Sequence, residues 1–206
     1  MPCLELCAAL KKEDMTAEYE EMLQCIREHA DFMLQTGLAY PPSEVNFEQS
    51  IVAPACDLLL QVYELTHEKR YLQGAEQQLF VLEQFQVMQS DYHLYECAIR
   101  HWDGYWFGKH KCYGDTFPHY WTVLTAVCFS RYAKLIAATA AARAECYKVR
   151  AENGAHSTLS MFFPDGSASC ACVYPATVNG TPAGFYDPFA NDQNWALYLY
   201  GKMLAD

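Results

Sequence analysis

The chain has 206 residues, of which 52% are hydrophobic and 19% are charged, which indicates one globular domain and excludes a disordered chain. Its formal net charge of -11 excludes partners that need a basic face, so we expect neither nucleic acid nor a membrane as a partner. No apolar run approaches the length of a membrane span, and residues 1–15 lack the cationic start of a secretory signal.

The ten cysteines favour a reduced, cytoplasmic protein. There is no CxxC, and the closest pair is Cys170 and Cys172. The others are expected to act as small buried hydrophobes. Those that stand singly among helical apolar positions are Cys25, Cys56, Cys97, Cys128 and Cys146.

Hydrophobic periodicity predicts an all-α fold built from antiparallel helical hairpins. A tight turn at Thr66-His67 joins the second helix to the third, and Pro54 marks either a kink or a late start in the second. The three helices of the first half are predicted at residues 16–35, 46–65 and 69–85.

The second half is predicted to contain three more helices and a small β-hairpin. Thr116 is expected to cap the fourth helix, with Pro118 in its first turn. The fifth helix runs from residue 139 to near Gly154, and the last covers 188–203. Turn signals at Pro164-Asp165-Gly166 and Asn179-Gly180 predict the β-hairpin within residues 160–187.

Three connections between the predicted helices are long, at residues 40–48, 91–116 and 164–192. Short connections make antiparallel neighbours, so alternating helices place all three long connections at one end of the molecule. Long loops in a compact domain are usually functional. We therefore expect a binding site at this common rim.

The rim segment HWDGYWFGKHKCYGDTFPHYW, residues 101–121, combines eight aromatic residues with three histidines and two aspartates. Aromatic faces cover the apolar face of a sugar ring, and polar side chains bond its hydroxyls. Glycoside cleavage needs one carboxyl as proton donor and one as base or nucleophile, so Asp103 and Asp115 are the predicted catalytic pair. The predicted substrate-binding residues are Glu48, Arg100, His101, Trp102, Tyr105, His119, Tyr120, Asp187, Asn191 and Asp192.

Some of these residues have a structural interpretation that the sequence leaves open. Asp115 and Asp187 each precede a proline at a predicted helix start, where a carboxylate is stabilising. Asp192 suits a bond to a neighbouring loop backbone. Glu96 and Arg100 have the i, i+4 spacing of an ion pair on a short helix.

No metal and no cofactor are predicted. The histidines of the aromatic region recur at intervals that fit no familiar ligand spacing; they are His93, His101, His110 and His119. The sequence also contains no serine nucleophile elbow, glycine-rich phosphate loop or dinucleotide fingerprint.

The stretch LLLQVYELTHEKRYLQGAEQQLFVLEQF, residues 58–85, resembles a helical hairpin of the six-hairpin glycosidase superfamily, the (α/α)6 toroids. Lys69, Tyr71, Leu72 and Ala75 match the K-x-Y-L-x-x-A pattern of its outer helix. YAKLIAATAAARAECYKVRAEN resembles a second, degenerate hairpin, and NDQNWALYL resembles an inner helix. The segment AIRHWDGYWFGKHKCYGDTFPHYW resembles the C-terminal part of uncharacterised bacterial members.

The resemblance implies a toroid of twelve helices, whereas six are predicted here, about half a ring. A half ring would expose the apolar sides of its end helices. The chain is therefore expected to be a single helical domain that forms the C-terminal half of a larger toroid, completed by a missing N-terminal half, or a half-ring that associates as a homo-oligomer.

Three functions remain open from the sequence. The first expectation is a glycoside hydrolase, or part of one, that uses Asp103 and Asp115 on an oligo- or polysaccharide. The second is a polysaccharide lyase, in which His101 or Tyr105 removes a proton beside a uronate carboxylate that Arg100 neutralises. The third is a non-catalytic sugar-binding or assembly module.

Overall fold

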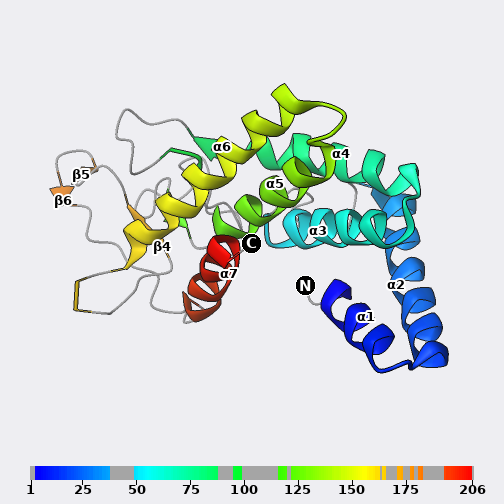
Figure 1. Ribbon diagram of the computed structural model, residues 1–206. Coiled ribbons are helices and arrows are strands. Elements are labelled where there is room, and N and C mark those ends of the chain that lie inside the picture. The colour runs from blue at the N-terminus through cyan, green and yellow to red at the C-terminus, as the bar shows by residue number, and fades with distance from the viewer. Residues whose placement is uncertain are drawn as a thin grey trace.

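Figure 1 shows the computed structural model, a stack of helical hairpins with short strands gathered on one side. The structure describes residues 3–37, 49–87, 95–98, 116–119, 122–162, 164–165, 171–173, 177–178, 181–182 and 193–205. Its α-helices are α1 (Cys3–Lys12), α2 (Thr16–Thr36), α3 (Gln49–Thr66), α4 (Lys69–Glu83), α5 (Thr122–Ile136), α6 (Ala141–Thr158) and α7 (Gln193–Ala205), and a 3-10 helix, η3 (Leu159–Met161), follows α6.

Five of the six predicted helices are confirmed with ends that shift by a few residues: α2, α3, α4, α6 and α7. The interior of α3 continues through Pro54, so this proline neither delays nor ends the helix. Residues 188–192 of the last predicted helix lie outside the described residues.

The sequence analysis missed helix α1. The segment is short for an independent helix, and its stability comes from contacts with α2 and α3. The Leu4 amide donates to Gln61 Oε1 of α3 (3.2 Å), and the Cys7 side chain is buried. Only the tertiary structure supplies these partners.

The predicted start of the fourth helix is wrong. Thr116 does not cap a helix, because Thr116–His119 forms strand β3 and α5 begins at Thr122. Strand β3 pairs antiparallel with β4 (Ala171–Val173), and the register shifts between Thr116 and His119. This ladder has two strands, so Pro118 lies on an edge, where a missing backbone donor is tolerated.

The predicted β-hairpin is confirmed at β5 (Thr177–Val178) and β6 (Thr181–Pro182), which pair on either side of Asn179-Gly180. A further two-stranded ladder joins β1 (Gln86–Val87) to β2 (Cys97–Ala98) inside the connection from α4 to α5. The strands are short additions to a helical fold, since every ladder in the described residues has two strands.

The helices divide into inner and outer members of each hairpin. Residues 56–62 of α3 are all buried, which is typical of a helix surrounded by other elements. Helix α4 instead buries one face through Tyr71, Ala75, Leu79 and Leu82, while Phe80 is exposed on the other. Helix α3 is therefore an inner helix, and α4 is the outer helix that covers it.

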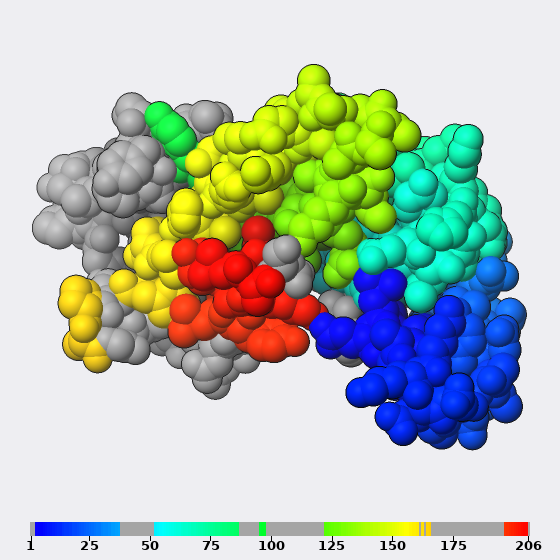
Figure 2. All heavy atoms as spheres, viewed as in Figure 1, coloured from blue at the N-terminus to red at the C-terminus, as the bar shows by residue number. Residues whose placement is uncertain are grey.

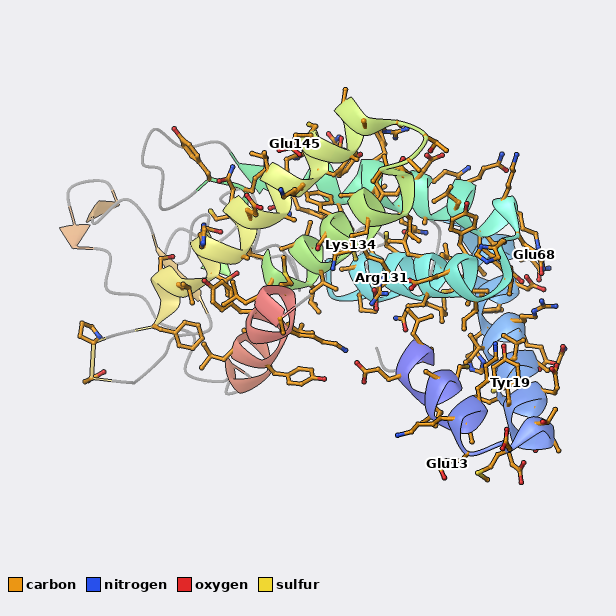
Figure 3. All side chains as sticks on the ribbon, viewed as in Figure 1. Glu13, Tyr19, Glu68, Arg131, Lys134 and Glu145 are labelled. Carbon is orange, nitrogen blue, oxygen red and sulfur yellow. The ribbon has the colours of Figure 1, made fainter. Side chains whose placement is uncertain are left out.

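Alternate helices run in the same direction. The Cys128 thiol of α5 donates to the Ala53 carbonyl of α3 (3.2 Å), and Arg131, further along α5, bonds Asp57, further along α3 (Figure 3). Outer helices α4 and α6 are also parallel, because Arg143 pairs with Glu76 and Arg150 pairs with Glu83. Inner helices α3 and α5 therefore begin at the same end of the molecule.

Buried tyrosines tie the outer helices to their neighbours through carboxylates. The Tyr71 hydroxyl of α4 donates to Asp31 of α2 (2.9 Å), and the Tyr132 hydroxyl of α5 donates to Glu76 of α4 (2.6 Å). The Tyr147 hydroxyl of α6 donates to Glu83 of α4. These bonds cross between hairpins and fix the lateral packing of the stack.

Helices α7 and α2 are among those that leave large apolar side chains exposed. On α7 these are Leu197, Tyr198 and Leu204, and on α2 Phe32 is 45% exposed. Lys202 of α7 pairs with Glu5 of α1, and in Figure 2 the C-terminal helix, red, reaches the N-terminal region, blue, at one point. Association of this chain with a further toroid segment stays a prediction.

The cysteine prediction is partly wrong. The described cysteines are all free, and Cys56, Cys97 and Cys128 are buried as expected. Cys25 and Cys146 are exposed, because each falls on the solvent side of an outer helix.

Candidate functional site

Most of the sequence-predicted site lies outside the described residues. The predicted catalytic residues Asp103 and Asp115 belong to this group. So do the predicted substrate-binding residues Glu48, Arg100, His101, Trp102, Tyr105, Tyr120, Asp187, Asn191 and Asp192. The backbone of His119 is described, and it lies in strand β3 opposite Ala171.

The described strands do bring two of the long connections together. Strand β3 belongs to the connection that follows α4, and its partner β4 belongs to the connection that follows α6. Strand β2 contacts both β3 and α6. The described strands of the second and third connections therefore lie together at one end of the stack, as helix parity predicted for these two connections.

The most constrained residue in this region is Glu96, directly before β2. It adopts a positive φ of 58° and is only 6% exposed. Its two carboxylate oxygens accept from Arg150 of α6, Nε at 3.0 Å and Nη2 at 3.1 Å. The alternative of a short helix around Glu96 is wrong, since the left-handed backbone at this residue is incompatible with an α-helix.

Arg150 is the centre of a small polar network. Its Nη1 atom lies 3.2 Å from Glu83 Oε1 at the end of α4, and its guanidinium lies over the Phe129 ring at 4.9 Å. Burial and the bond to Glu83 raise the pKa of Tyr147 to about 12. Tyr147 therefore stays protonated at neutral pH and serves as a hydrogen-bond donor, not as a base. Sequence reasoning missed this network because its members are far apart in the chain.

Two hollows in the described surface lie away from the strands, on either side of Met203 in α7. One, of about 480 Å³, is lined by Arg131, Lys134 and Lys202 with apolar side chains of α5 and α7. The other, of about 520 Å³, follows α5 and α6 past Lys134 and Glu145, both labelled in Figure 3. Neither contains a residue of the sequence-predicted site.

Two of the cations that line the first hollow are held in ion pairs. Arg131 pairs with Asp57 (2.9 Å) and with Glu64 (3.2 Å), and Lys202 pairs with Glu5.

Neither a metal cluster nor a membrane span is found in the described part of the chain. No three histidine, cysteine, aspartate or glutamate side chains there come together as metal ligands. None of its helices is both long and apolar enough to cross a bilayer.

Comparison with solved structures defines the class of fold. Inner and outer helices paired in successive hairpins are the arrangement of an (α/α) toroid, and this chain forms part of one. It is similar to the solved structure of Polysaccharide Lyase BACCELL_00875, with a TM-score of 0.77 and 46% sequence identity. The match covers 96% of this chain and 29% of that chain.

The similarity to a polysaccharide lyase supports the resemblance to an (α/α) toroid. It does not support a glycosidase in particular. The chain spans 29% of the length of the lyase chain that it matches. No protein-family model matches the chain, and no curated protein matches it either.

Proposed function

We propose that this chain is a carbohydrate-active toroid segment and that its chemistry is that of a polysaccharide lyase. The carrying observation is the 46% identity with a polysaccharide lyase over 96% of this chain. The segment rich in aromatic residues and acids, residues 101–121, supports a sugar ligand, because ring faces and polar groups together suit a pyranose.

The lyase reaction would use His101 or Tyr105 as the base and Arg100 as the group that neutralises the uronate carboxylate. The base removes the proton from C5, the C–H electron pair becomes the C4–C5 double bond, and the C4–O glycosidic bond breaks. The departing oxygen then takes a proton from a general acid. No step needs an oxidant or an added group.

The test is formation of the unsaturated product from uronate-containing polysaccharides. Polygalacturonate, alginate and hyaluronan are incubated separately with the 206-residue chain, and the ultraviolet absorbance of the new double bond is followed. A rise in absorbance that is lost in His101→Ala or Tyr105→Phe supports the proposal. A folded chain that produces no absorbance from any of the three substrates contradicts it.

Hydrolysis is the second candidate, because Asp103 and Asp115 lie within the same aromatic segment. Replacement of Asp103 by Asn separates the two reactions. A hydrolase should lose nearly all turnover, whereas a lyase with a His or Tyr base should keep much of it. New reducing ends without ultraviolet absorbance would favour hydrolysis, and sugar binding without either signal would favour a non-catalytic module.

Association with a further toroid segment is a separate proposal. It is supported by the exposed apolar side chains Leu197, Tyr198 and Leu204 on α7. Sedimentation analysis tests it directly, since a homo-oligomer should dissociate on dilution, and a monodisperse monomer at all concentrations would oppose self-association.

A further inference from the structure

Glu96 combines a backbone conformation that is unusual for a glutamate with a buried side chain. A positive φ of 58° is a conformation in which glycine is comfortable and other residues are strained. Asp14 and His67 share this conformation, but they lie in the short turns after α1 and α3. Among the described non-glycine residues with a positive φ, Glu96 is the one that is buried. Its side chain therefore contributes an interaction that glycine would not supply.

That interaction is the two-point bond with Arg150. Planar guanidinium and carboxylate groups that meet through two parallel bonds fix orientation as well as distance. Arg150 is also bonded to Glu83 and lies over the Phe129 ring, so its position does not depend on Glu96 alone. The pair therefore fixes the chain to α6 at the point where β2 begins.

The position of the pair in the chain gives it a functional consequence. Arg100, His101 and Asp103 follow Glu96 by four, five and seven residues. At the other end of this stretch, β3 contacts α6 and pairs with β4. Helix α6 thus contacts both β2 and β3, the described strands on either side of residues 99–115 in the sequence.

We infer that Glu96 and Arg150 are positioning residues that anchor β2, which directly precedes the predicted catalytic residues in the chain, to α6. This inference rests on the proposed function for its catalytic part. A small displacement of reacting groups lowers the rate strongly without changing which groups react. The pair is therefore expected to affect kcat while leaving the pH profile in place.

The test compares Arg150→Lys with Arg131→Lys. Both arginines bridge two carboxylates, and their side chains are 21% and 22% exposed, so the two substitutions remove similar buried contacts. Arg131 joins α3 to α5, and both carboxylates that it pairs with belong to α3 and not to a strand. Glu96→Gln is a milder variant that keeps the shape of the side chain. It replaces Arg150→Lys in the test if Arg150→Lys does not fold.

Two readouts are measured on the folded 206-residue chain. Hydrogen exchange of residues 86–87 and 97–98 should quicken at least 10-fold in Arg150→Lys and Glu96→Gln, but not in Arg131→Lys at equal global stability. On the polysaccharide that the wild type cleaves, kcat should fall about 10- to 100-fold with unchanged apparent pKa values. Glu96→Gly should also lose activity, although it relieves the backbone strain.

The outcomes test separately whether Glu96 and Arg150 anchor β2 to α6 and whether this anchor affects catalysis. Unchanged exchange in both Glu96→Gln and Arg150→Lys overturns the anchor itself. Faster exchange with wild-type kcat overturns the positioning role and leaves the pair merely structural. A wild-type chain without activity overturns the proposed function and the catalytic part of the inference, while the exchange measurement still decides whether the pair anchors β2.

Discussion

Arg131 of α5 and Asp57 of α3 form an ion pair between two inner helices, with Nε to Oδ1 at 2.9 Å. The Asp57 side chain is only 7% exposed, and its other oxygen accepts from Gln61 at 2.6 Å. Gln61 in turn accepts from the Leu4 amide of α1. One buried carboxylate thus links α1, α3 and α5, and its removal should weaken all three contacts.

Asp57→Ala is expected to lower the free energy of unfolding by about 3 kcal/mol, because it leaves a half-buried guanidinium without its main partner. Urea unfolding followed by circular dichroism measures the change. Glu64→Ala is the matched control, since Glu64 bonds the same arginine but is 44% exposed and should contribute less than about 1 kcal/mol. Equal losses in the two variants would contradict this assignment.

Alkaline pH should destabilise the fold through its buried tyrosines. Burial and the bonds to Asp31 and Glu83 raise the pKa values of Tyr71 and Tyr147 to about 12. The folded pKa exceeds the unfolded value near 10, so the stabilisation is complete below pH 10 and is lost as pH rises toward 12. Urea midpoints should fall over this window, and the fall should be smaller in the Tyr71→Phe, Tyr147→Phe double variant. A fall of the same size in that variant would exclude these tyrosines as its cause.

Two helical glycines should respond differently to alanine. Gly201 in α7 has open space around it, so Gly201→Ala is expected to raise stability by about 0.5–1 kcal/mol through helix propensity alone. A methyl group on Gly74 of α4 would collide with Leu34 of α2 and lie 3.3 Å from Leu59 Cδ1. Gly74→Ala should therefore be at least about 1 kcal/mol less stable than Gly201→Ala. Thermal unfolding measures the melting temperatures of both variants. Similar melting temperatures would mean that Leu34 moves aside freely.

Thiol reactivity should distinguish two exposed cysteines from two that are fully buried between α3 and α5. Cys25 and Cys146 are exposed and should react with iodoacetamide in the folded protein. Burial raises the pKa of the Cys56 thiol well above its usual range, and Cys128 beside it is also fully buried. Mass spectrometry of the modified peptides should show alkylation of Cys56 and Cys128 only after denaturation. Modification of either in the native state would mean that α3 and α5 separate readily.

The helical hairpins were predictable because an amphipathic helix produces a hydrophobic periodicity that is visible in neighbouring residues. Residues 69–85 carry an apolar stripe that recurs at helical spacing, and α4 covers Lys69–Glu83. The turn at Thr66-His67 was equally local, and His67 adopts the positive φ that such a tight turn requires. Parity of the helices then followed from the lengths of the connections.

The region around the candidate site was less predictable because its partners are distant in sequence. Thr116 and Pro118 have the local character of a helix start, yet their backbone pairs with residues 171–173 and forms a strand. Glu96 has Arg100 at helical spacing, yet its carboxylate bonds Arg150, which lies 54 residues away. In each case a local preference gave way to a tertiary contact that a sequence pattern does not contain.

The amino-acid sequence alone predicted five helices and the alternation of their directions, because each depends on neighbouring residues or on connection length. The tertiary structure decided the strand pairing of β3 with β4, the docking of α1 and the choice of Arg150 as the partner of Glu96. These depend on which surfaces meet when the hairpins stack, and the free energy of burying a charged or hydrogen-bonding group is settled only when its partner is in place.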